Sequence, residues 1–400
     1  MSKKTLLPLL YIFYITSIFL IGQIKPLGLP INFNIIFTIL LFIFCFATER
    51  KLYTDKLLNY YWLFIAFYGL SALVTGYFID FFHFLYSSVL MAYIAYWSTI
   101  IVARNYNINT ILPYNIILIG VFASIVTISQ GMGIPIENQF VDALTMNKNS
   151  TDDFVYNGYD WGFALSGIYL SPVINGRYLL FFFLISLLLI KNKYNIIYII
   201  ITTIILVGIF ICQQRSAFYL SLFSLSVLIL KYKSKSKVFK YVYLGTIIIS
   251  IMVLLPYFLD YLNTSGSRLT ENSGTGREEI WPVAIDFYLS NPIFAGNRLF
   301  MEITHMTSHN LLLSAFIAGG FLGGIILSVF VIRLISKSIK TIFGKYNNYN
   351  SLVISLMIFS LIGDSMVHNF GFVQADLPMF IALALYYIFI ENNNTFDNIS

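Results

Sequence analysis

The sequence predicts an all-α, polytopic integral membrane protein of about twelve transmembrane helices, with a long outer loop that contains an amphipathic helix. Of the 400 residues, 58% are hydrophobic and only 10% are charged, and the mean hydropathy is +0.80. The charges stand in short intervals between apolar runs of about 20 residues, the length that crosses a hydrocarbon core about 30 Å thick. This pattern leaves no room for a soluble domain, so we predict a single transmembrane domain over residues 1–400.

A hydrophobicity window of about 19 residues divides the chain into twelve predicted spans. They lie near residues 5–24, 31–48, 57–79, 84–103, 111–129, 171–190, 195–212, 214–230, 241–259, 309–332, 351–367 and 372–390. The first span resembles a signal peptide in charge and length, but it lacks a small-residue cleavage site, so we predict that it is retained. The two spans that flank Gln213-Gln214-Arg215 are also compatible with one long, interrupted helix.

The lysines predict the orientation of the chain. With the N-terminus inside, the cytoplasmic segments hold 17 Lys and Arg against 4 Asp and Glu, and the outer segments hold 7 against 14, consistent with the net charge of +6. The strongest anchor is the run Lys231–Lys237 followed by Lys240, which we interpret as a positive-inside signal and not as a nucleic-acid-binding patch. Both termini are therefore predicted to be cytoplasmic, and no nucleic acid is expected as a partner.

Arginine is concentrated on the predicted outer side. Five of the seven outer basic residues are arginines, whereas only three of the 17 inner ones are. Lys and Arg serve equally well as topology anchors, but the planar guanidinium can grip a phosphate or carboxylate with two parallel hydrogen bonds. The outer face is therefore predicted to bind an anion, and the residues available for this are Arg177, Arg215, Arg268, Arg277 and Arg298.

The predicted outer loop at residues 130–170 is acidic and aromatic. It carries five carboxylates together with Tyr156, Tyr159 and Trp161. Carboxylates accept hydrogen bonds from sugar hydroxyls, and aromatic rings stack on the C–H faces of sugars. A solvated loop with aromatic anchors at the membrane interface explains the same composition. Both interpretations stay open.

The predicted major outer loop, residues 260–308, contains an amphipathic helix. Apolar residues at 280, 281, 283, 284, 287 and 288 form one face, and Asn291-Pro292 ends the pattern. Thr275 and Glu278 have the spacing of a capping box, whereas Pro282 suits the first turn of a helix, so the start of the helix stays open. A glycine turn is predicted over residues 294–298, followed by a loop, and the next span opens with His309 and Asn310.

Several polar residues near the membrane are candidates for chemistry. Arg215 lies at a span junction, where snorkelling is the alternative to function, and Arg277 lies beside flexible glycines, where a solvent-exposed charge is the alternative. His309 stands near both arginines. His305 precedes it by four residues, but a loop without an acidic metal motif predicts no metal site. Asp364 is an acidic residue within the eleventh predicted span. Either it has a functional role, or it forms an ion pair with a residue such as Arg215.

Three short motifs, taken in order, carry a resemblance to a known family. They are Gln213-Gln214-Arg215-Ser216-Ala217, Gly276-Arg277-Glu278-Glu279-Ile280-Trp281, and Ser308-His309-Asn310-Leu311-Leu312-Leu313 followed by Gly319-Gly320. On a twelve-span scaffold they resemble the O-antigen polymerase and O-antigen ligase superfamily of bacterial envelopes, over residues 205–365. Asp364, near the outer end of the eleventh span, also fits the ligase pattern.

The resemblance implies an inverting, metal-independent glycosyltransferase without cofactors, of an architecture like the GT-C membrane enzymes. The donor would be a glycan on undecaprenyl pyrophosphate, with membrane lipid and a chain-length regulator as further partners. Arg215 and Arg277, assisted by Arg177 or Arg298, would bind the pyrophosphate, and His309 would be the catalytic base. Asn310 and Asp364 would support the site. The implied location is the bacterial inner (plasma) membrane, with the active site facing the periplasm.

Polymerase and ligase differ only in the acceptor that the resemblance implies. A ligase transfers the glycan to lipid A core in lipopolysaccharide biosynthesis, and a polymerase transfers it to a new repeat unit on the same carrier. A His-x-His before the Asn is common in ligases, but position 307 is Thr, which favours a polymerase. A flippase or transporter of lipid-linked sugars remains a further alternative, although its charges should line a central cavity and here they cluster at the outer ends of the spans.

Overall fold

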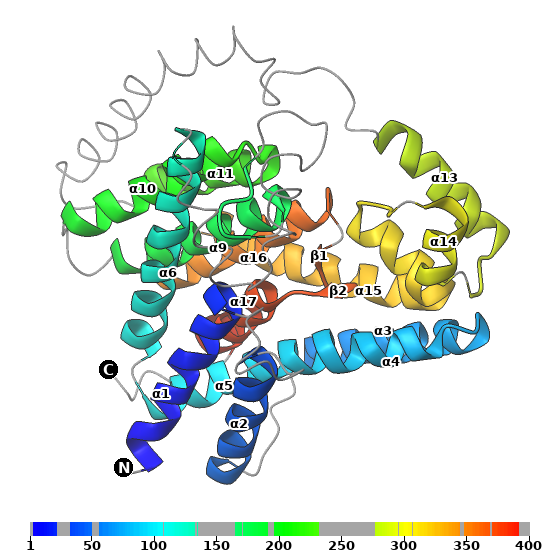
Figure 1. Ribbon diagram of the computed structural model, residues 1–400, viewed down its shortest axis with the longest axis horizontal. Helices are drawn as coiled ribbons and strands as arrows, with labels where there is room; N and C mark the ends of the chain where they lie inside the picture. Colours follow the sequence, from blue (N-terminus) through cyan, green and yellow to red (C-terminus); the bar gives the residue numbers. More distant parts are fainter. Residues whose placement is uncertain are drawn as a thin grey trace, which may run out of the picture. The chain divides into compact units, whose positions relative to one another are not determined.

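In the part of the chain that the structure describes, the regular elements are helices, apart from one pair of two-residue strands (Figure 1). The computed structural model describes residues 3–21, 33–49, 56–106, 108–132, 134, 165–169, 171–190, 196–231, 277–294, 296–305, 307–344, 348–368 and 370–391. The strands β1 (Phe370–Gly371) and β2 (Gln374–Ala375) pair in parallel. The predicted all-helical class is therefore confirmed.

The helices follow the predicted hydrophobic runs. They are α1 (Lys3–Thr16), α2 (Phe33–Thr48), α3 (Lys56–Val74), α4 (Phe78–Phe84), α5 (Met91–Asn105), α6 (Ile108–Gly131), α9 (Pro172–Ile190), α10 (Ile196–Cys212), α11 (Arg215–Lys231), α13 (Arg277–Ser290), α14 (Asn297–Thr304), α15 (Leu311–Phe343), α16 (Tyr349–Ser365) and α17 (Leu377–Tyr386), with π-helical turns at Ser17–Ile21, Leu85–Leu90 and Tyr387–Glu391. Each predicted span overlaps one or more of these elements except the span at 241–259, which lies outside the described residues.

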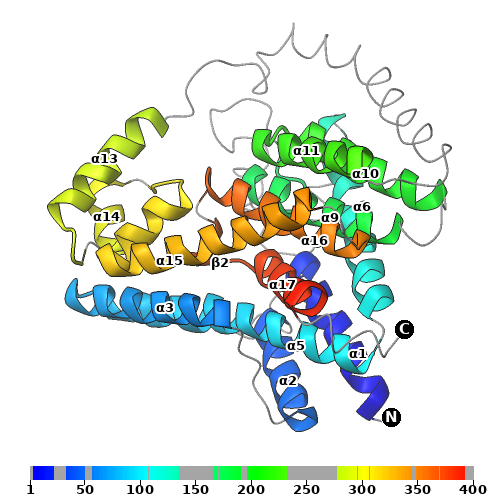
Figure 2. The ribbon, with the colours of Figure 1, turned by 180° about the vertical axis from the view of Figure 1, so that it is seen from behind.

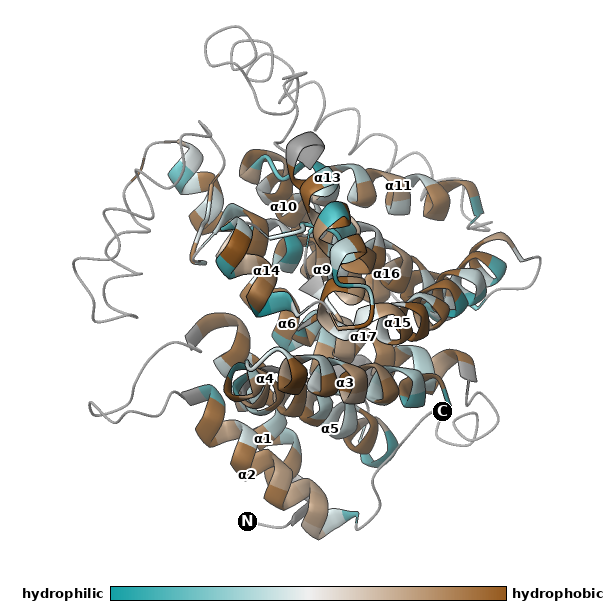
Figure 3. Ribbon diagram, turned by 90° about the vertical axis from the view of Figure 1, so that its right-hand side faces the viewer, coloured by the Kyte–Doolittle hydropathy of each residue, from teal (hydrophilic) through white to brown (hydrophobic). Residues whose placement is uncertain are grey.

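Four described helices are long and apolar enough to cross a membrane. They are Lys56–Val74, Leu112–Gly131, Pro172–Ile190 and Leu311–Phe343, and several shorter apolar helices accompany them. The ribbons of α3 and α15 are coloured mostly as hydrophobic residues in Figure 3, as expected for helices that contact lipid or one another rather than water. The chain is thus a membrane protein by composition and helix length, and the number of twelve spans remains a prediction.

The chain divides into two units. Unit 1 comprises Met1–Cys45, Val102–Asn272 and Asn348–Val353, and unit 2 comprises Phe46–Ile101, Ser273–Asn347 and Ile354–Ser400. Both units combine segments that are distant in sequence, so neither is a contiguous stretch of chain. The predicted single transmembrane domain remains a prediction.

In unit 1, α9 is the central helix and packs against α6, α10 and α11. Its residues Phe181, Phe182 and Phe183 are fully buried. Gly120 on α6 lies against Phe182, where an added Cβ would be 2.7 Å from the Phe182 Cβ, and Gly208 on α10 lies as closely against α6. Small residues at helix contacts let apolar helices approach closely where no hydrophobic effect drives them together. The group α6, α9, α10 and α11 is seen from both sides in Figures 1 and 2.

In unit 2, α3 runs along α15, and these two helices share the most extensive contact between the described elements (Figure 2). Gly319 and Gly323 of α15 face Phe64 and Phe67 of α3. At the far end of α15, Arg333 Nη1 donates to the Tyr60 hydroxyl at 2.6 Å. The long contact makes α3 a fixed support for α15, at whose first residues the candidate catalytic histidine is found.

Candidate functional site

The candidate base His309 lies in a tight turn directly before α15. Its backbone is left-handed, with φ 46°, a conformation that is uncommon outside glycine. Its Nε2 is 2.8 Å from the Thr307 hydroxyl, and its side chain is half-buried. The hydrogen bond to Thr307 fixes the plane of the imidazole ring. A half-buried imidazole whose ring is oriented by a hydrogen bond has the geometry of a general base.

Asn310 joins this turn to two other elements. Its Oδ1 accepts from the Leu313 backbone N–H at 3.0 Å, which caps the first turn of α15. Its Nδ2 donates to the Met366 carbonyl at 3.0 Å, just beyond the end of α16. Replacing Asn310 would therefore remove both the cap of α15 and the hydrogen bond that connects this turn to the end of α16. The supporting role predicted for Asn310 has a structural counterpart in these two bonds.

Asp364 forms a buried pair with His368. The Asp364 carboxylate Oδ1 is 3.9 Å from His368 Nε2, and the two side chains are 0% and 8% exposed. This pair flanks Met366, the residue that Asn310 contacts, so Asn310 and Asp364 lie on segments that touch. His368 was not among the predicted site residues, and its spacing of four residues from Asp364 on a helical period was the signal that could have found it.

The helix α15 is interrupted at Gly320. This residue has φ 62° and ψ −167°, a combination that is essentially restricted to glycine. In an intact helix the Phe321 N–H would donate to the Ile317 carbonyl. Here the Phe321 N–H donates to the Pro292 carbonyl at 2.9 Å, and the Gly296 N–H donates to the Ile317 carbonyl at 2.8 Å. The predicted span over 309–332 is present as part of α15, and it is interrupted at this point because residues 292 and 296 supply the missing hydrogen-bond partners.

The segments that precede His309 pack against the first part of α15. A helix, α13, lies where the amphipathic helix was predicted, and it ends at Ser290 before Asn291-Pro292. Its amphipathic character remains a prediction, because Val283 of the predicted apolar face is exposed. Ala284 and Phe287 of α13, Phe300 of α14 and Ile317 of α15 form one buried cluster. The predicted glycine turn is correct at Gly296, which has φ 86°, but wrong beyond it, because α14 begins at Asn297 and places Phe300 in this cluster.

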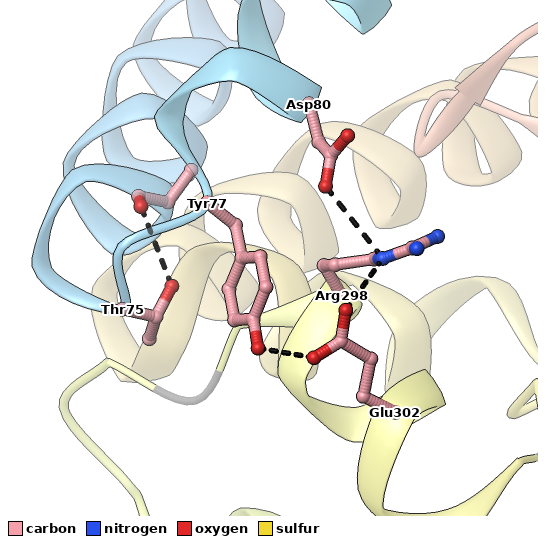
Figure 4. A network of polar contacts seen from close by, with 6 residues as sticks. Thr75, Tyr77, Asp80, Arg298 and Glu302 are labelled. Carbon is pink, nitrogen blue, oxygen red and sulfur yellow. Dashed lines mark hydrogen bonds and ion pairs between the residues drawn. The ribbon is translucent and has the colours of Figure 1, made fainter.

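Arg298 on α14 lies between two carboxylates (Figure 4). Its Nε is 3.1 Å from Glu302 Oε1 and 3.6 Å from Asp80 Oδ2, and about half of its side chain is exposed. The Tyr77 hydroxyl donates to the other Glu302 oxygen. This hydrogen bond and, to a smaller extent, the Arg298 guanidinium lower the pKa of Glu302, and the same hydrogen bond raises the pKa of Tyr77. The network ties α14 to the turn between α3 and α4.

A second interruption lies in unit 1, between α10 and α11. The helix α10 ends at Cys212 and α11 begins at Arg215, so the predicted junction is two helices and not one. Gln213 between them is left-handed, with φ 58°. The Leu165 N–H donates to the Cys212 carbonyl at 3.3 Å, so a segment of the predicted outer loop at 130–170 binds this junction.

The predicted pyrophosphate ligands fall in both units. Arg177 on α9 is completely buried and Arg215 on α11 is half-buried, and these two helices pack against each other. A guanidinium within a hydrocarbon layer costs at least about 2.5 kcal/mol, which favours a functional reason for keeping it. Arg298 lies in unit 2. Arg277 is the first residue of α13 in unit 2, and its side chain lies outside the described part of the structure.

Comparison with protein families finds a similarity in the central part of the chain. Residues 197–328 match a family model described as O-antigen ligase. No curated protein matches the chain, and no solved structure matches it. The matched region runs from α10 to the middle of α15, and it therefore contains both helix interruptions and the turn of His309.

Proposed function

We propose that the chain is a surface-polysaccharide polymerase of the O-antigen polymerase and ligase superfamily. The match of residues 197–328 to a family model described as O-antigen ligase supports this proposal. In this proposal it joins oligosaccharide repeat units carried on undecaprenyl pyrophosphate. The observation that carries the proposal is the turn of His309 inside the matched region, where Thr307 orients the imidazole and Asn310 caps the following helix. The ring is thereby held in one place, as a general base requires.

The proposed reaction forms one glycosidic bond and breaks one sugar–phosphate bond. The acceptor hydroxyl gives its proton to His309 while its oxygen attacks the anomeric carbon of the donor sugar. The bond from that carbon to the pyrophosphate oxygen breaks, and lipid pyrophosphate leaves. Attack from the face opposite the leaving group inverts the anomeric centre.

Arginines would stabilise the leaving pyrophosphate in place of a divalent cation. We assign this role to Arg215 and Arg277, with Arg177 assisting, because fixed guanidinium groups neutralise charge as it develops and grip phosphate oxygens in pairs. Arg298 is the weakest member of this set, since Glu302 and Asp80 already compete for its guanidinium. The burial of Arg177 supports the assignment, because a buried cation is retained at a cost.

Asn310 and the pair Asp364–His368 would support the base. Asn310 connects the turn of His309 to the segment that carries the pair. A general base must lie within hydrogen-bond reach of the proton that it takes. The supporting residues would keep His309 within that reach without touching substrate.

A ligase is the alternative within the same superfamily. The apparatus for the donor would be unchanged, and only the acceptor, lipid A core, would differ. Thr307 stands where ligases commonly have histidine, which favours the polymerase. A flippase of lipid-linked sugars would need no base, so an oriented His309 disfavours it.

We place the enzyme in the bacterial inner membrane, with both termini in the cytoplasm and the site facing the periplasm. The excess of Lys and Arg in the predicted inner segments supports this orientation. The proposed partners are the undecaprenyl-pyrophosphate-linked glycan, membrane lipid and a chain-length regulator.

The lipopolysaccharide ladder of a deletion strain tests the function. Cells that carry the wild-type gene should show the ladder, and cells that carry His309→Ala should show only core plus one repeat unit. Bare core with accumulating undecaprenyl-linked polymer would mean a ligase, and an unchanged ladder would remove His309 as the base. The matched control is His305→Ala, an exposed histidine at the end of α14, which should leave the ladder as in wild type.

A further inference from the structure

Gln213 departs from two rules that folded proteins usually obey. Its backbone is left-handed with φ 58°, although it is neither glycine nor asparagine. Its side chain is only 2% exposed, and its amide oxygen Oε1 is buried with no hydrogen-bond partner in the described part of the chain. Strained backbone and buried, unsatisfied polar atoms both concentrate at functional sites. Their coincidence at one residue points to a hydrogen-bond donor from outside the described residues.

A second unsatisfied oxygen lies on the helix that packs against this junction. Asn175 on α9 is fully buried, and its Nδ2 donates to Thr127 Oγ1 and to the Leu165 carbonyl, each at 3.0 Å. These two acceptors fix which end of the amide is nitrogen. Its Oδ1 is then an acceptor, and it too has no hydrogen-bond partner among the described residues.

The two amides belong to one small region of unit 1. Asn175 Nδ2 is 3.6 Å from the Cys212 sulfur, and Cys212 directly precedes Gln213. The next residue of α9, Gly176, is so close to the Gln214 side chain that an added Cβ would overlap it. The first turn of α9 therefore rests on the α10–α11 junction, and both unsatisfied oxygens belong to these touching segments.

The chemistry of these atoms selects the ligand. Two amide oxygens can only accept hydrogen bonds, so the ligand must present donors. An ionised pyrophosphate presents acceptors alone and would be repelled. A sugar presents hydroxyl groups and, in amino sugars, an N-acetyl N–H, all of which donate. Arg215, two residues after Gln213, is the residue to which the proposed function assigns the pyrophosphate.

We infer that Gln213 recognises the sugar that is bonded directly to the pyrophosphate. The Gln213 amide oxygen accepts a hydrogen bond from a hydroxyl or amide group of that sugar. Asn175 supplies a second acceptor for the same sugar. The spacing is suitable, because residues two apart are at most about 7 Å from Cα to Cα and the first sugar is covalently joined to the phosphate. The inference rests on the proposed function, since it names the sugar subsite of the same donor.

Two lipid probes separate recognition of sugar from recognition of pyrophosphate. One is undecaprenyl pyrophosphate alone, and the other is the undecaprenyl-pyrophosphate-linked repeat unit extracted from cells that lack the protein. The full-length protein in lipid nanodiscs is titrated with each, and its thermal unfolding is measured without ligand. The variant is Gln213→Met, which keeps the length of the side chain and removes the acceptor.

The glycosylated probe should bind Gln213→Met about three- to tenfold more weakly than wild type, the usual loss for one neutral hydrogen bond. The bare lipid should bind both proteins equally. The ligand-free variant should unfold at a higher temperature, because it no longer buries an unsatisfied acceptor. The matched control is Gln130→Met, whose lost oxygen accepts from the Gly167 N–H at 2.9 Å and whose unfolding temperature should therefore fall.

A second variant guards against misfolding. Gln213→Gly relaxes the left-handed backbone and should show the same selective loss of the glycosylated probe. If Gln213→Met binds each probe as tightly as wild type does, the inference is overturned and water is the partner of the oxygen. Equal weakening of both probes would overturn it as well, because sugar would not be what Gln213 reads. Failure of wild type to bind either probe would instead refute the proposed function.

Discussion

The α10–α11 junction in unit 1 and the break in α15 in unit 2 interrupt helices in similar ways but with different residues. In each, a backbone N–H from a preceding loop segment donates to a carbonyl at the interruption, Leu165 to Cys212 and Gly296 to Ile317. The residue with positive φ is Gly320 in α15 and Gln213 at the junction. Glycine adopts this conformation without strain, whereas glutamine does not.

The difference separates a structural break from a functional one. At Gly320 both backbone groups that the break releases find partners in the segment after α13, so the break is satisfied by the fold itself. At Gln213 the fold keeps a strained residue with a buried, unsatisfied oxygen, where glycine would have been less costly. We therefore expect changes at Gly320 to lower stability first, and changes at the junction to lower activity first.

Gly320→Ala should have the largest effect of the variants considered. An added Cβ would overlap the Ile293 carbonyl oxygen, and the backbone conformation is essentially closed to other residues. We expect a loss of about 3 kcal/mol of stability, measured by thermal unfolding in detergent. Gly319→Ala is the control, since its Cβ would lie 3.1 Å from the ring of Phe64 and at an ordinary contact distance of 3.8 Å from the Gly324 backbone nitrogen. Equal stability of the two variants would show that the break is not fixed by Gly320.

Arg215→Lys should lower polymer formation at least about tenfold while the protein remains folded. Lysine keeps the charge but cannot hold two phosphate oxygens with a planar fork. Polymer length is measured on gels, and the amount of protein in the membrane by immunoblot. Normal polymer with normal protein would refute the pyrophosphate assignment and the functional character of the junction.

Gln213→Gly should raise the stability of the ligand-free protein by about 1 kcal/mol, because the strain of the left-handed backbone is removed. The adjacent Gln214→Gly is the control. Gln214 has no positive φ and its side chain packs on Gly176, so this change should lower the unfolding temperature. If both variants lower it, Gln213 is not strained and the contrast with Gly320 disappears.

The smallest expected effect on stability concerns the hydrogen bond between the Tyr77 hydroxyl and the Glu302 carboxylate. The lowered pKa of Glu302 means that its contribution is present above the ordinary glutamate pKa and is lost as pH falls through the lowered value. The raised pKa of Tyr77 means that its contribution is present below the ordinary tyrosine pKa and is lost as pH rises through the raised value. The difference in unfolding temperature between wild type and Tyr77→Phe should therefore be greatest between about pH 5 and pH 9 and should shrink on both sides.

A difference that does not change with pH would show that the Tyr77 hydroxyl stabilises through packing alone. The effect should be small at every pH, because both side chains are exposed and water screens their interaction.

The sequence predicted several local features for physical reasons that act over a few residues. Asn310 before an apolar run predicted the start of α15, and Asn291-Pro292 predicted the end of α13. In each case the signal lies within one or two helical turns of the residue concerned, so no distant contact was needed.

The sequence did not predict α14 or the break in α15. Gly319-Gly320 in an apolar run is compatible with an intact helix, since glycine is common in membrane helices. The break is stable only because Pro292 and Gly296 supply hydrogen-bond partners about 25 residues away. In the same way, α14 forms because Phe300 enters a cluster with Ala284 and Ile317.

The roles predicted for Arg177, Arg215, Arg277, Arg298 and His309 remain proposals. The structure describes the surroundings of each side chain except Arg277, which lies outside its described part. The polar neighbours Asn175 and His368 were missed because each is paired with a residue that only folding or helical spacing brings near. Their types gave no signal, since a single Asn or His in a span has several explanations.

The sequence by itself determined that this is a helical membrane protein, roughly where its helices lie, and which superfamily its central region resembles. Hydrophobic length and short motifs are local properties, and they can be read without a fold. Only the tertiary structure decided where helices break, which carboxylates hold Arg298, and which buried oxygens lack partners. These features depend on whether a segment distant in sequence packs close enough to hydrogen-bond with a backbone or side-chain group. No local sequence pattern predicts that contact.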